Sequence, residues 1–309
     1  MLLVNRTLPN SFEQYHDFIP DFDSFRTSIL NPLPLHIRIN TLKADPGTVV
    51  ASLKGKGASL RKSLPGNETF YTVNNLSSPG NSLEYFMGHI HPQALTSCLV
   101  SQVLDPKQKS LVLDLCAAPG GKTSHLAQLM GNRGLIVANE LYGSRHIPLG
   151  NTLTRLGVLN AAVTAYQAQE FPLKNRFEFI VADVPCSGEG RFRMIRPDFF
   201  YREVKDGKLL PALQKKILLR AFELLRPGGK MVYATCTYNP AENEGVVAHL
   251  LQRCEDAAVF PVTVDLPFEP GLIGWKSEKY GKQLERTLRF YPHRIDSVGF
   301  YLAGISRAG

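Results

Sequence analysis

From residue 111 onward, short apolar runs rich in β-branched residues alternate with longer segments that have helical periodicity. This alternation is typical of strands joined by crossover helices, so it predicts an α/β fold with a doubly wound, mostly parallel sheet. The expected strands are 111–115, 134–139, 161–165, 177–183, 230–235 and 298–302, and the expected helices are 121–130, 144–156, 211–226 and 241–253. Ligands of such sheets bind outside the carboxyl ends of the strands, so the residues that follow each strand are candidates for a functional site.

The first hundred residues differ in composition and predict a second, smaller α+β domain. They are rich in Pro, Asn, Ser and Phe and contain a clear alternating strand at 35–43. The alternation puts Ile37 and Arg38 on opposite faces, one apolar and one polar. The segment Asp105-Pro106-Lys107 has the composition of a linker, so we expect two domains at 1–105 and 106–309.

Charge and cysteine content restrict the setting in which the chain works. The formal net charge of the 309 residues is +8, which is compatible with a polyanionic partner. The five cysteines are an odd number without a CxxC pair, so we expect neither a disulfide framework nor a metal site. The N-terminal apolar run is too short for a signal peptide, and no stretch reaches transmembrane length. These features predict a cytoplasmic protein with reduced thiols and no membrane partner.

The Gly-rich turn after the first expected strand of the sheet has two interpretations. The segment 116–123 comes close to the phosphate-binding pattern G-x-x-x-x-G-K-[ST], and the strand that ends at Asp183 could supply the magnesium ligand of an ATPase. However, position 116 is not Gly, and Pro119 lacks the amide that a phosphate cradle requires. The next strand leads to Glu140, where an acidic side chain can bind both ribose hydroxyls of a nucleoside. A turn of small residues beside this acid favours adenosine with a short tail, such as S-adenosylmethionine.

Two cysteines follow the ends of two later strands and indicate covalent chemistry. Cys186 lies in a Pro-Cys-Ser-Gly turn, and Cys236 follows the strand that ends at Thr235. Methylation at carbon 5 of a pyrimidine requires such a thiol, because a thiolate that adds to carbon 6 turns the ring into an enamine that can attack a sulfonium methyl group. A base must then remove the proton from carbon 5, and the thiol must leave. If the two strands are adjacent, a second cysteine fits these steps, with Asp183 as hydrogen-bond partner of the ring.

Several short strings of residues, spread over nearly the whole chain, match the sequence pattern of one protein family. They are Arg38–Lys43, Asp114–Thr123, Ala138–Glu140, Ala182–Gly190, Arg226–Gly229, Tyr233–Glu244 and Gly299–Ala303. The set resembles the Nop/Sun family of RNA (cytosine-5) methyltransferases, and it is most similar to the bacterial ribosomal-RNA branch. The two-cysteine combination is its most specific part. The resemblance implies a Rossmann-like methyltransferase fold for the second domain.

The resemblance also implies a role for each matching residue. Cys236 would be the nucleophile on carbon 6, and Cys186 would assist release of the methylated product. Asp183 and Lys122 would contact the target cytosine or the cofactor tail. The residues implied to hold S-adenosylmethionine are Cys116, Ala117, Ala118, Pro119, Gly120, Gly121, Lys122, Glu140, Arg145, Gln167 and Asp183. Gln167 stands where the family usually has Asp, and its amide oxygen can still accept from the adenine amine.

RNA is the expected partner, with affinity from phosphate contacts and specificity from unpaired bases. The candidate contacts are Arg38, Lys43, Arg191, Arg193 and Arg196. The target base has to be unpaired or flipped out of its stack to reach both thiols. We expect a substrate in ribosomal RNA or a ribosomal particle. The alternatives are a transfer-RNA methyltransferase, an ATPase of the P-loop type, and a non-catalytic RNA-binding factor in ribosome assembly.

Overall fold

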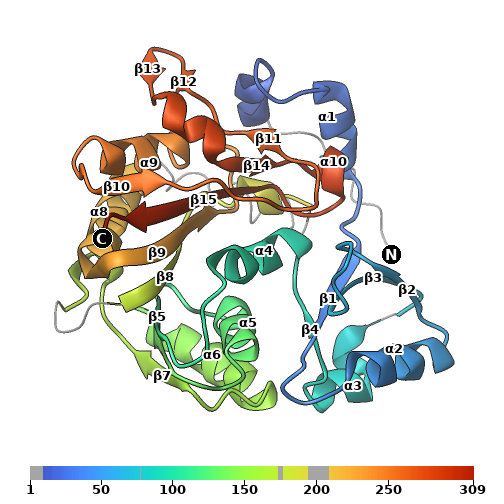
Figure 1. Cartoon of the computed structure of the whole chain (residues 1–309). Coiled ribbons are helices and arrows are strands. Elements are labelled where there is room, and N and C mark those ends of the chain that lie inside the picture. The colour runs from blue at the N-terminus through green and yellow to red at the C-terminus, as the bar shows by residue number, and fades with distance from the viewer. Residues whose placement is uncertain (1–9, 77, 173–176, 194–208) are drawn as a thin grey trace.

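The computed structural model describes residues 10–76, 78–172, 177–193 and 209–309. A large sheet occupies one side of the molecule and a small sheet the other (Figure 1). The centre of the large sheet consists of parallel strands in the order β9-β8-β5-β6-β7. Their bounds are β5 (Leu111–Asp114), β6 (Leu135–Asn139), β7 (Ala161–Thr164), β8 (Phe177–Asp183) and β9 (Leu225–Thr235).

Antiparallel strands extend the large sheet beyond β9. They are β15 (Phe300–Arg307), β14 (Leu288–Phe290), β11 (Glu269–Pro270) and β10 (Ala257–Val259), and β15 pairs with β9, β14 and β10. The strand expected at 298–302 is therefore longer and begins later. The direction of winding reverses between β5 and β8. Strands β6 and β7 lie on one side of β5, whereas β8 and β9 lie on its other side. This switch point is where open α/β sheets bind ligands.

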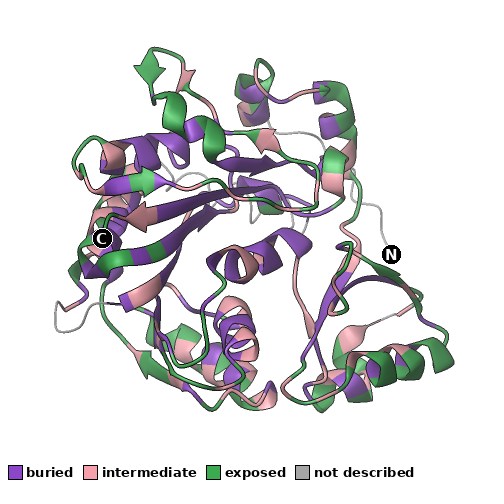
Figure 2. Cartoon of the chain, viewed as in Figure 1, coloured by how far each residue is buried: buried purple, intermediate pink, exposed green. Residues whose placement is uncertain are grey.

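Helices cover both faces of the large sheet, which confirms the doubly wound α/β prediction. Alternate side chains of β9 point to opposite faces, as strand geometry requires. Tyr233 belongs to the core under α8 (Leu210–Leu224) and α9 (Glu244–Leu251), whereas Val232 belongs to the core under α4 (Leu95–Leu104) and α5 (Gly121–Leu129). Strands β5, β8 and β9 are accordingly buried along most of their length (Figure 2). Helix α6 (Gly143–Arg155) packs through Leu149 and Leu153 beside β6.

The small sheet is antiparallel, with strand order β2-β3-β1-β4. Its elements are β1 (Leu35–Ile39), α2 (Pro46–Gly55), β2 (Ser59–Lys62), β3 (Phe70–Asn74), α3 (Leu83–Phe86) and β4 (Ile90–Pro92). One face packs on α2, where Ile37 and Ile39 meet Val49 and Leu53. This arrangement confirms the smaller α+β unit expected in the first hundred residues.

The opposite face of β1 is buried as well, which overturns the prediction that Arg38 contacts RNA. Arg38 is 0% exposed, because α5 of the large sheet covers it. Its guanidinium donates to Gln93 Oε1 (3.1 Å), Ser124 Oγ (2.8 Å) and Gln128 Oε1. Burial lowers the pKa of Arg38 to about 10. The polar face of the strand is therefore an interface with α5 and not a solvated surface.

The first described segment packs on the large-sheet side of the molecule. It consists of η1 (Asn10–Tyr15) and α1 (Phe22–Leu30), and α1 contacts α10 (Pro292–Ile295). Phe12, Tyr15 and Phe25 form a buried aromatic cluster with Tyr238 and Tyr291. Helix α4 also belongs to the large sheet, although it precedes the expected boundary at residue 105. The division into domains at that residue stays a prediction.

Short elements complete the described structure. They are η2 (Pro79–Asn81), η3 (Ala168–Glu170), η4 (Glu189–Arg191), β12 (Gly274–Trp275), β13 (Glu278–Lys279) and η6 (Lys282–Arg286). In the part of the chain that the structure describes, no helix is both long enough and apolar enough to span a membrane.

Candidate active site

The two cysteines singled out in the sequence meet at the carboxyl ends of adjacent strands. Strands β8 and β9 are parallel neighbours, with Asp183 opposite Ala234. Cys186 and Cys236 follow these two ends, and their sulfur atoms are 3.3 Å apart. Both side chains are half-buried, so a substrate can reach them from solvent. The adjacency of the strands is the condition that the two-thiol chemistry required.

The surroundings of the two sulfurs give them different protonation states. The thiol of Cys186 donates to Cys236, and this contact lowers the pKa of Cys236. Burial opposes the effect, while the cations of Arg191 and Lys122 reinforce it. The same contact and burial raise the pKa of Cys186, and the charge of Glu242 adds to the rise. Cys236 is therefore the more acidic thiol of the pair, and Cys186 is the less acidic one.

An ion pair lies next to the cysteines at the switch point of the sheet. Lys122, in the first turn of α5, places its Nζ 2.5 Å from Asp183 Oδ2 at the end of β8. Burial by itself lowers the pKa of Lys122, but the carboxylates of Asp183 and Asp114 overcome it and raise the pKa. Lys122 is therefore held as a cation beside Cys236.

The turn between β5 and α5 brings the small residues of 116–121 to the same edge. Asn139, at the end of β6, fixes this edge: its side chain donates to Leu115 O (3.1 Å) and Tyr166 O (2.9 Å) and accepts from Thr164 Oγ1 (3.0 Å). The ends of β5, β6 and β7 are thereby joined. This role of Asn139 was not predicted from the sequence, although an amide at the end of an apolar strand is a signal for it.

Glu140 and Arg145 pair beside the small-residue turn. Glu140 is 3% exposed, and its Oε2 is 3.1 Å from Arg145 Nη1, while Arg145 Nη2 donates to Ala118 O at 2.8 Å. Tyr142 and Tyr166, which follow the ends of β6 and β7, are 60% and 48% exposed, so these strand ends also present exposed aromatic surface. A carboxylate, a turn of small residues and adjacent apolar surface fit an adenosine ligand.

Gln167 lies at the next strand end, just after β7. It is exposed, and its Oε1 accepts from Gln169 Nε2 at 2.6 Å. A carbonyl oxygen has a second lone pair, so it retains the capacity to accept from an adenine amine.

Buried acids and amides that the sequence analysis did not single out hold the cysteine loops together. Glu242 Oε2 accepts from Ser187 N and from Gln214 Nε2, both at 2.9 Å. Asn243 accepts from Thr235 Oγ1 (2.5 Å) and donates to Thr237 O (3.0 Å). The residues before and after Cys236 are thus fixed by one amide. The clustering of Asn and Glu at 239–244, next to an apolar helix, is the signal that could have found them.

The predicted RNA contacts have different outcomes. Arg191 is exposed and follows Gly190, whose N donates to Cys236 O at 2.8 Å. Arg193 is only 6% exposed and donates to Asn31 O, Pro32 O and Asp296 Oδ1, so its assignment as an RNA contact is wrong. Arg196 lies outside the described residues.

Lys43 is exposed but distant from the cysteines along the strand direction. Its Nζ donates to Arg155 O (3.2 Å) at the last residue of α6. Because α6 starts near the carboxyl end of β6, its last turn lies at the opposite end of the parallel strands. A contact between Lys43 and RNA away from the target base stays a prediction.

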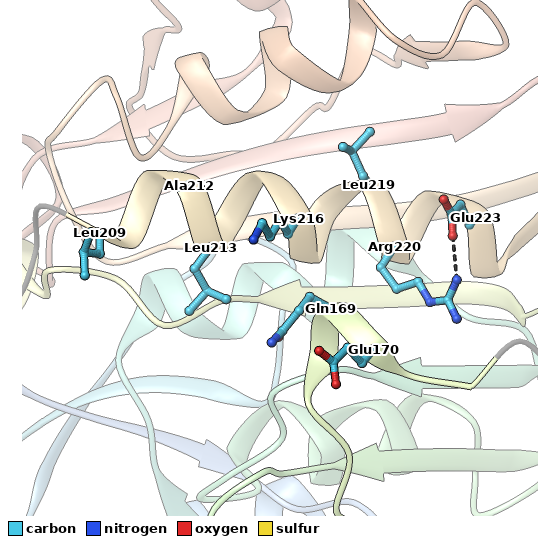
Figure 3. A pocket seen from close by; sticks show the side chains of 9 residues that line it. All are labelled: Gln169, Glu170, Leu209, Ala212, Leu213, Lys216, Leu219, Arg220 and Glu223. Carbon is cyan, nitrogen blue, oxygen red and sulfur yellow. Dashed lines mark hydrogen bonds and ion pairs between the residues drawn. The ribbon is translucent and has the colours of Figure 1, made fainter.

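A groove of about 640 Å³ lies between α8 and η3, apart from the cysteines (Figure 3). Leu213, Lys216 and Gln169 are among the residues that line it, and neither cysteine does. Arg220, at one end, pairs with Glu223 and donates to Phe171 O. Gln169, one of the lining residues, hydrogen-bonds to Gln167 of the predicted site.

The sequence pattern of the family described as 16S rRNA methyltransferase RsmB/F matches residues 101–306. The chain belongs to this family. A tRNA (cytosine(49)-C(5))-methyltransferase of Pyrococcus abyssi is 38% identical to it, over 98% of this chain and 96% of that protein. Ribosomal RNA small subunit methyltransferase F of Shewanella amazonensis is 34% identical over 99% of this chain, which spans 65% of that longer protein.

A solved structure described as a methyltransferase homolog protein from Pyrococcus horikoshii matches this RsmB/F family member with a TM-score of 0.81. The two are 29% identical, and the match covers 98% of this chain and 100% of the other. The likeness extends over both sheets and confirms the Rossmann-like methyltransferase fold. Membership of the family overturns the ATPase alternative for the Gly-rich turn.

Proposed function

We propose that this protein transfers a methyl group from S-adenosylmethionine to carbon 5 of a cytosine in RNA, through a covalent bond between Cys236 and carbon 6. The observation that carries the proposal is the 3.3 Å contact between two thiols of opposite protonation tendency. A nucleophile and a proton donor in contact, at the ligand-binding edge of a methyltransferase fold, match the needs of this reaction.

Each residue of the site has its own role in the proposed reaction. The Cys236 thiolate attacks carbon 6, and the ring electrons move to carbon 5, which becomes nucleophilic. Asp183, with its charge balanced by Lys122, orients the edge of the cytosine. When bound, the cofactor supplies an electrophilic methyl group. The proton of carbon 5 then passes to solvent, and the electrons of that bond restore the double bond between carbons 5 and 6. The bond between carbon 6 and Cys236 breaks and returns the Cys236 thiolate, and Cys186 assists this release of the product.

The cofactor would lie along the carboxyl ends of β5, β6 and β7. The turn 116–121 leaves room for it, Glu140 would bind the ribose hydroxyls, and Gln167 the adenine amine. Arg145 already pairs with Glu140, so it would keep that carboxylate oriented. Arg191 would contact a phosphate of the RNA near the target base.

Ribosomal RNA is the first candidate substrate, because the family description names it. Transfer RNA is the second, and a specific observation favours it. The Pyrococcus abyssi relative that this chain matches almost end to end is described as acting on tRNA.

The test is a denaturing gel of Cys186→Ala incubated with S-adenosylmethionine and either ribosomal RNA or tRNA transcripts. We expect a protein–RNA adduct that survives denaturation with one of the two RNA classes. The adduct should disappear in Cys236→Ala and in the double variant. Cofactor binding without an adduct or methylation on either RNA, or on ribosomal particles, would reject the proposal and favour a non-catalytic RNA-binding role.

A further inference from the structure

A buried carboxylate connects the two cysteine loops with the N-terminal segment. We infer that Glu189 is a positioning residue that sets Cys236 against Cys186, and that Tyr15 holds Glu189 in place. The inference rests on the proposed function, since it assigns a role within the same reaction. Glu189 hydrogen-bonds to the residues that follow Cys236, Tyr15 hydrogen-bonds to Glu189, and neither side chain reacts itself.

The contacts of Glu189 lie immediately beside Cys236. Its Oε2 accepts from Thr237 Oγ1 at 2.9 Å and from Tyr238 N at 3.3 Å. Thr237 Oγ1 also lies 2.7 Å from Ser187 Oγ, on the residue that follows Cys186. One chain of hydrogen bonds therefore joins the residue after each cysteine to the same carboxylate.

Tyr15 completes this cluster from the far end of the sequence. Its hydroxyl is 2.8 Å from both carboxylate oxygens of Glu189, across 174 residues of sequence. The Tyr15 side chain is 0% exposed and packs among the aromatic residues around Tyr238. The position of Glu189 is thus determined by η1 and not by its own loop alone.

The direction of the hydrogen bonds follows from the charge of Glu189. An ionised carboxylate only accepts, so Tyr15 and Thr237 must donate to it, and Ser187 must then donate to Thr237. Burial raises the pKa of Glu189 to about 7, and its donors oppose that rise. At pH 8 the carboxylate is largely ionised, so every hydrogen bond in the series from Ser187 through Thr237 is donated toward Glu189. Glutamine has the same size but carries no charge and has only one acceptor oxygen, so it loses the charge-assisted hydrogen bonds from Tyr15 and Thr237.

The backbone of the same loop makes the coupling rigid. Gly190 N donates to Cys236 O at 2.8 Å, and Gly190 O accepts from Gly299 N at 3.0 Å. A displacement of Glu189 is therefore passed to the peptide that carries Cys236. The separation of the two sulfurs is the quantity that should respond.

The experiment compares Glu189→Gln, Tyr15→Phe and the double variant at pH 8, with Tyr85→Phe on α3 as the control for loss of a tyrosine hydroxyl. The first readout needs no RNA: it is the rate at which diamide oxidises Cys186 and Cys236 to a disulfide, followed by peptide mapping. The second is the rate of methyl transfer to RNA with both cysteines present. Cofactor affinity and thermal unfolding report whether each variant is folded.

We expect each single variant to slow both rates about tenfold or more, the scale of one lost hydrogen bond to a charged group. The double variant should be no slower than the slower single one, and cofactor affinity should stay within about twofold. Unchanged rates, additive effects, or a parallel loss of cofactor affinity would overturn the inference. If the parent transfers no methyl group to RNA but the disulfide rates respond as expected, the proposed function fails and the positioning role stands.

Discussion

At the scale of single residues, the two cysteines differ because of their neighbours. Cys236 lies near the cations Arg191 and Lys122, whereas the charge of Glu242 acts on Cys186. A thiolate is the nucleophilic form of cysteine, so the contact with Cys186, reinforced by the two cations, favours Cys236 as the side chain that reacts. The two sulfur atoms are 3.3 Å apart, so each thiol acts directly on the pKa of the other.

Removing the donor should make Cys236 less reactive at neutral pH. Cys186→Ala deletes the contact that contributes most to lowering the pKa of Cys236, so that pKa rises. A raised pKa means less thiolate below it, and alkylation of Cys236 by iodoacetamide should slow several-fold at pH 7 and recover at alkaline pH. The measurement is the alkylation rate against pH, by mass spectrometry of the Cys236 peptide. An unchanged pH profile would contradict the assignment.

The ion pair beside the cysteines should matter more than an ion pair at the surface. Asp183→Asn leaves Lys122 without its partner, and we expect a loss of about 1–3 kcal/mol in the free energy of unfolding, reduced from the fully buried case by partial exposure. Methyl transfer should fall by about a hundredfold or more. Urea denaturation and methylation assays check both. The control is Glu178→Gln, which breaks a more exposed pair with Arg226 and should cost less than about 0.5 kcal/mol.

At the scale of elements, the strands and their ends were predictable, whereas the surfaces that cover them were not. Apolar runs located β5, β8 and β9, and hence Cys186 and Cys236. Alternation along β1 correctly placed Ile37 in the core but implied a solvated Arg38. The residue that covers Arg38 and bonds to it, Ser124, is 86 positions away, and no local pattern reveals such a contact.

The burial of charged residues was not predictable either, because it also depends on residues distant in sequence. Arg193 follows a cysteine loop in a basic stretch, and Glu189 lies in the loop itself, so both suggest solvent exposure. Each is buried by residues from the start of the chain, namely Asn31 and Tyr15. Burial of a charge depends on long-range partners, which the composition of a segment does not contain.

The loop after β8 passes too close to its neighbours to accept a side chain at Gly190. A Cβ there would lie 2.2 Å from Gly299 O and 2.9 Å from Cys236 O. Gly190→Ala should therefore cost about 2–4 kcal/mol of stability and displace Cys236. Chemical denaturation measures the first effect, and disulfide formation with diamide the second. Gly143→Ala is the matched control, because no atom lies within 4 Å of the added methyl group, and it should be neutral or slightly stabilising.

At the scale of the whole molecule, the two sheets do not divide the chain into independent halves. Helix α4 supplies Leu99 and Leu104 to the core of the large sheet, and the segment 10–30 covers Tyr238 and Tyr291. Both lie before the linker at 105–107. The large sheet therefore needs parts of the chain that a sequence-based boundary assigns to the other domain.

This packing predicts the behaviour of a fragment. Residues 106–309 alone lack α4 and the aromatic cluster of η1 and α1, so large apolar surfaces are exposed. We expect this fragment to aggregate or to lack fixed tertiary structure, in contrast to the full chain. Soluble yield and near-ultraviolet circular dichroism check the expectation. A soluble fragment with a cooperative thermal transition would show that the boundary at 105 is a true domain limit.

The contact between Tyr15 and Glu189 also sets an order of events during synthesis. Tyr15 leaves the ribosome 174 residues before its partner, an interval on the order of ten to thirty seconds at ordinary rates of translation. During that time the first segment has no surface to dock on, and the cysteine loops do not yet exist. The nascent chain therefore cannot assemble its reaction centre early. An enzyme that acts on RNA acquires that ability only after the segment that carries both cysteine loops has left the ribosome.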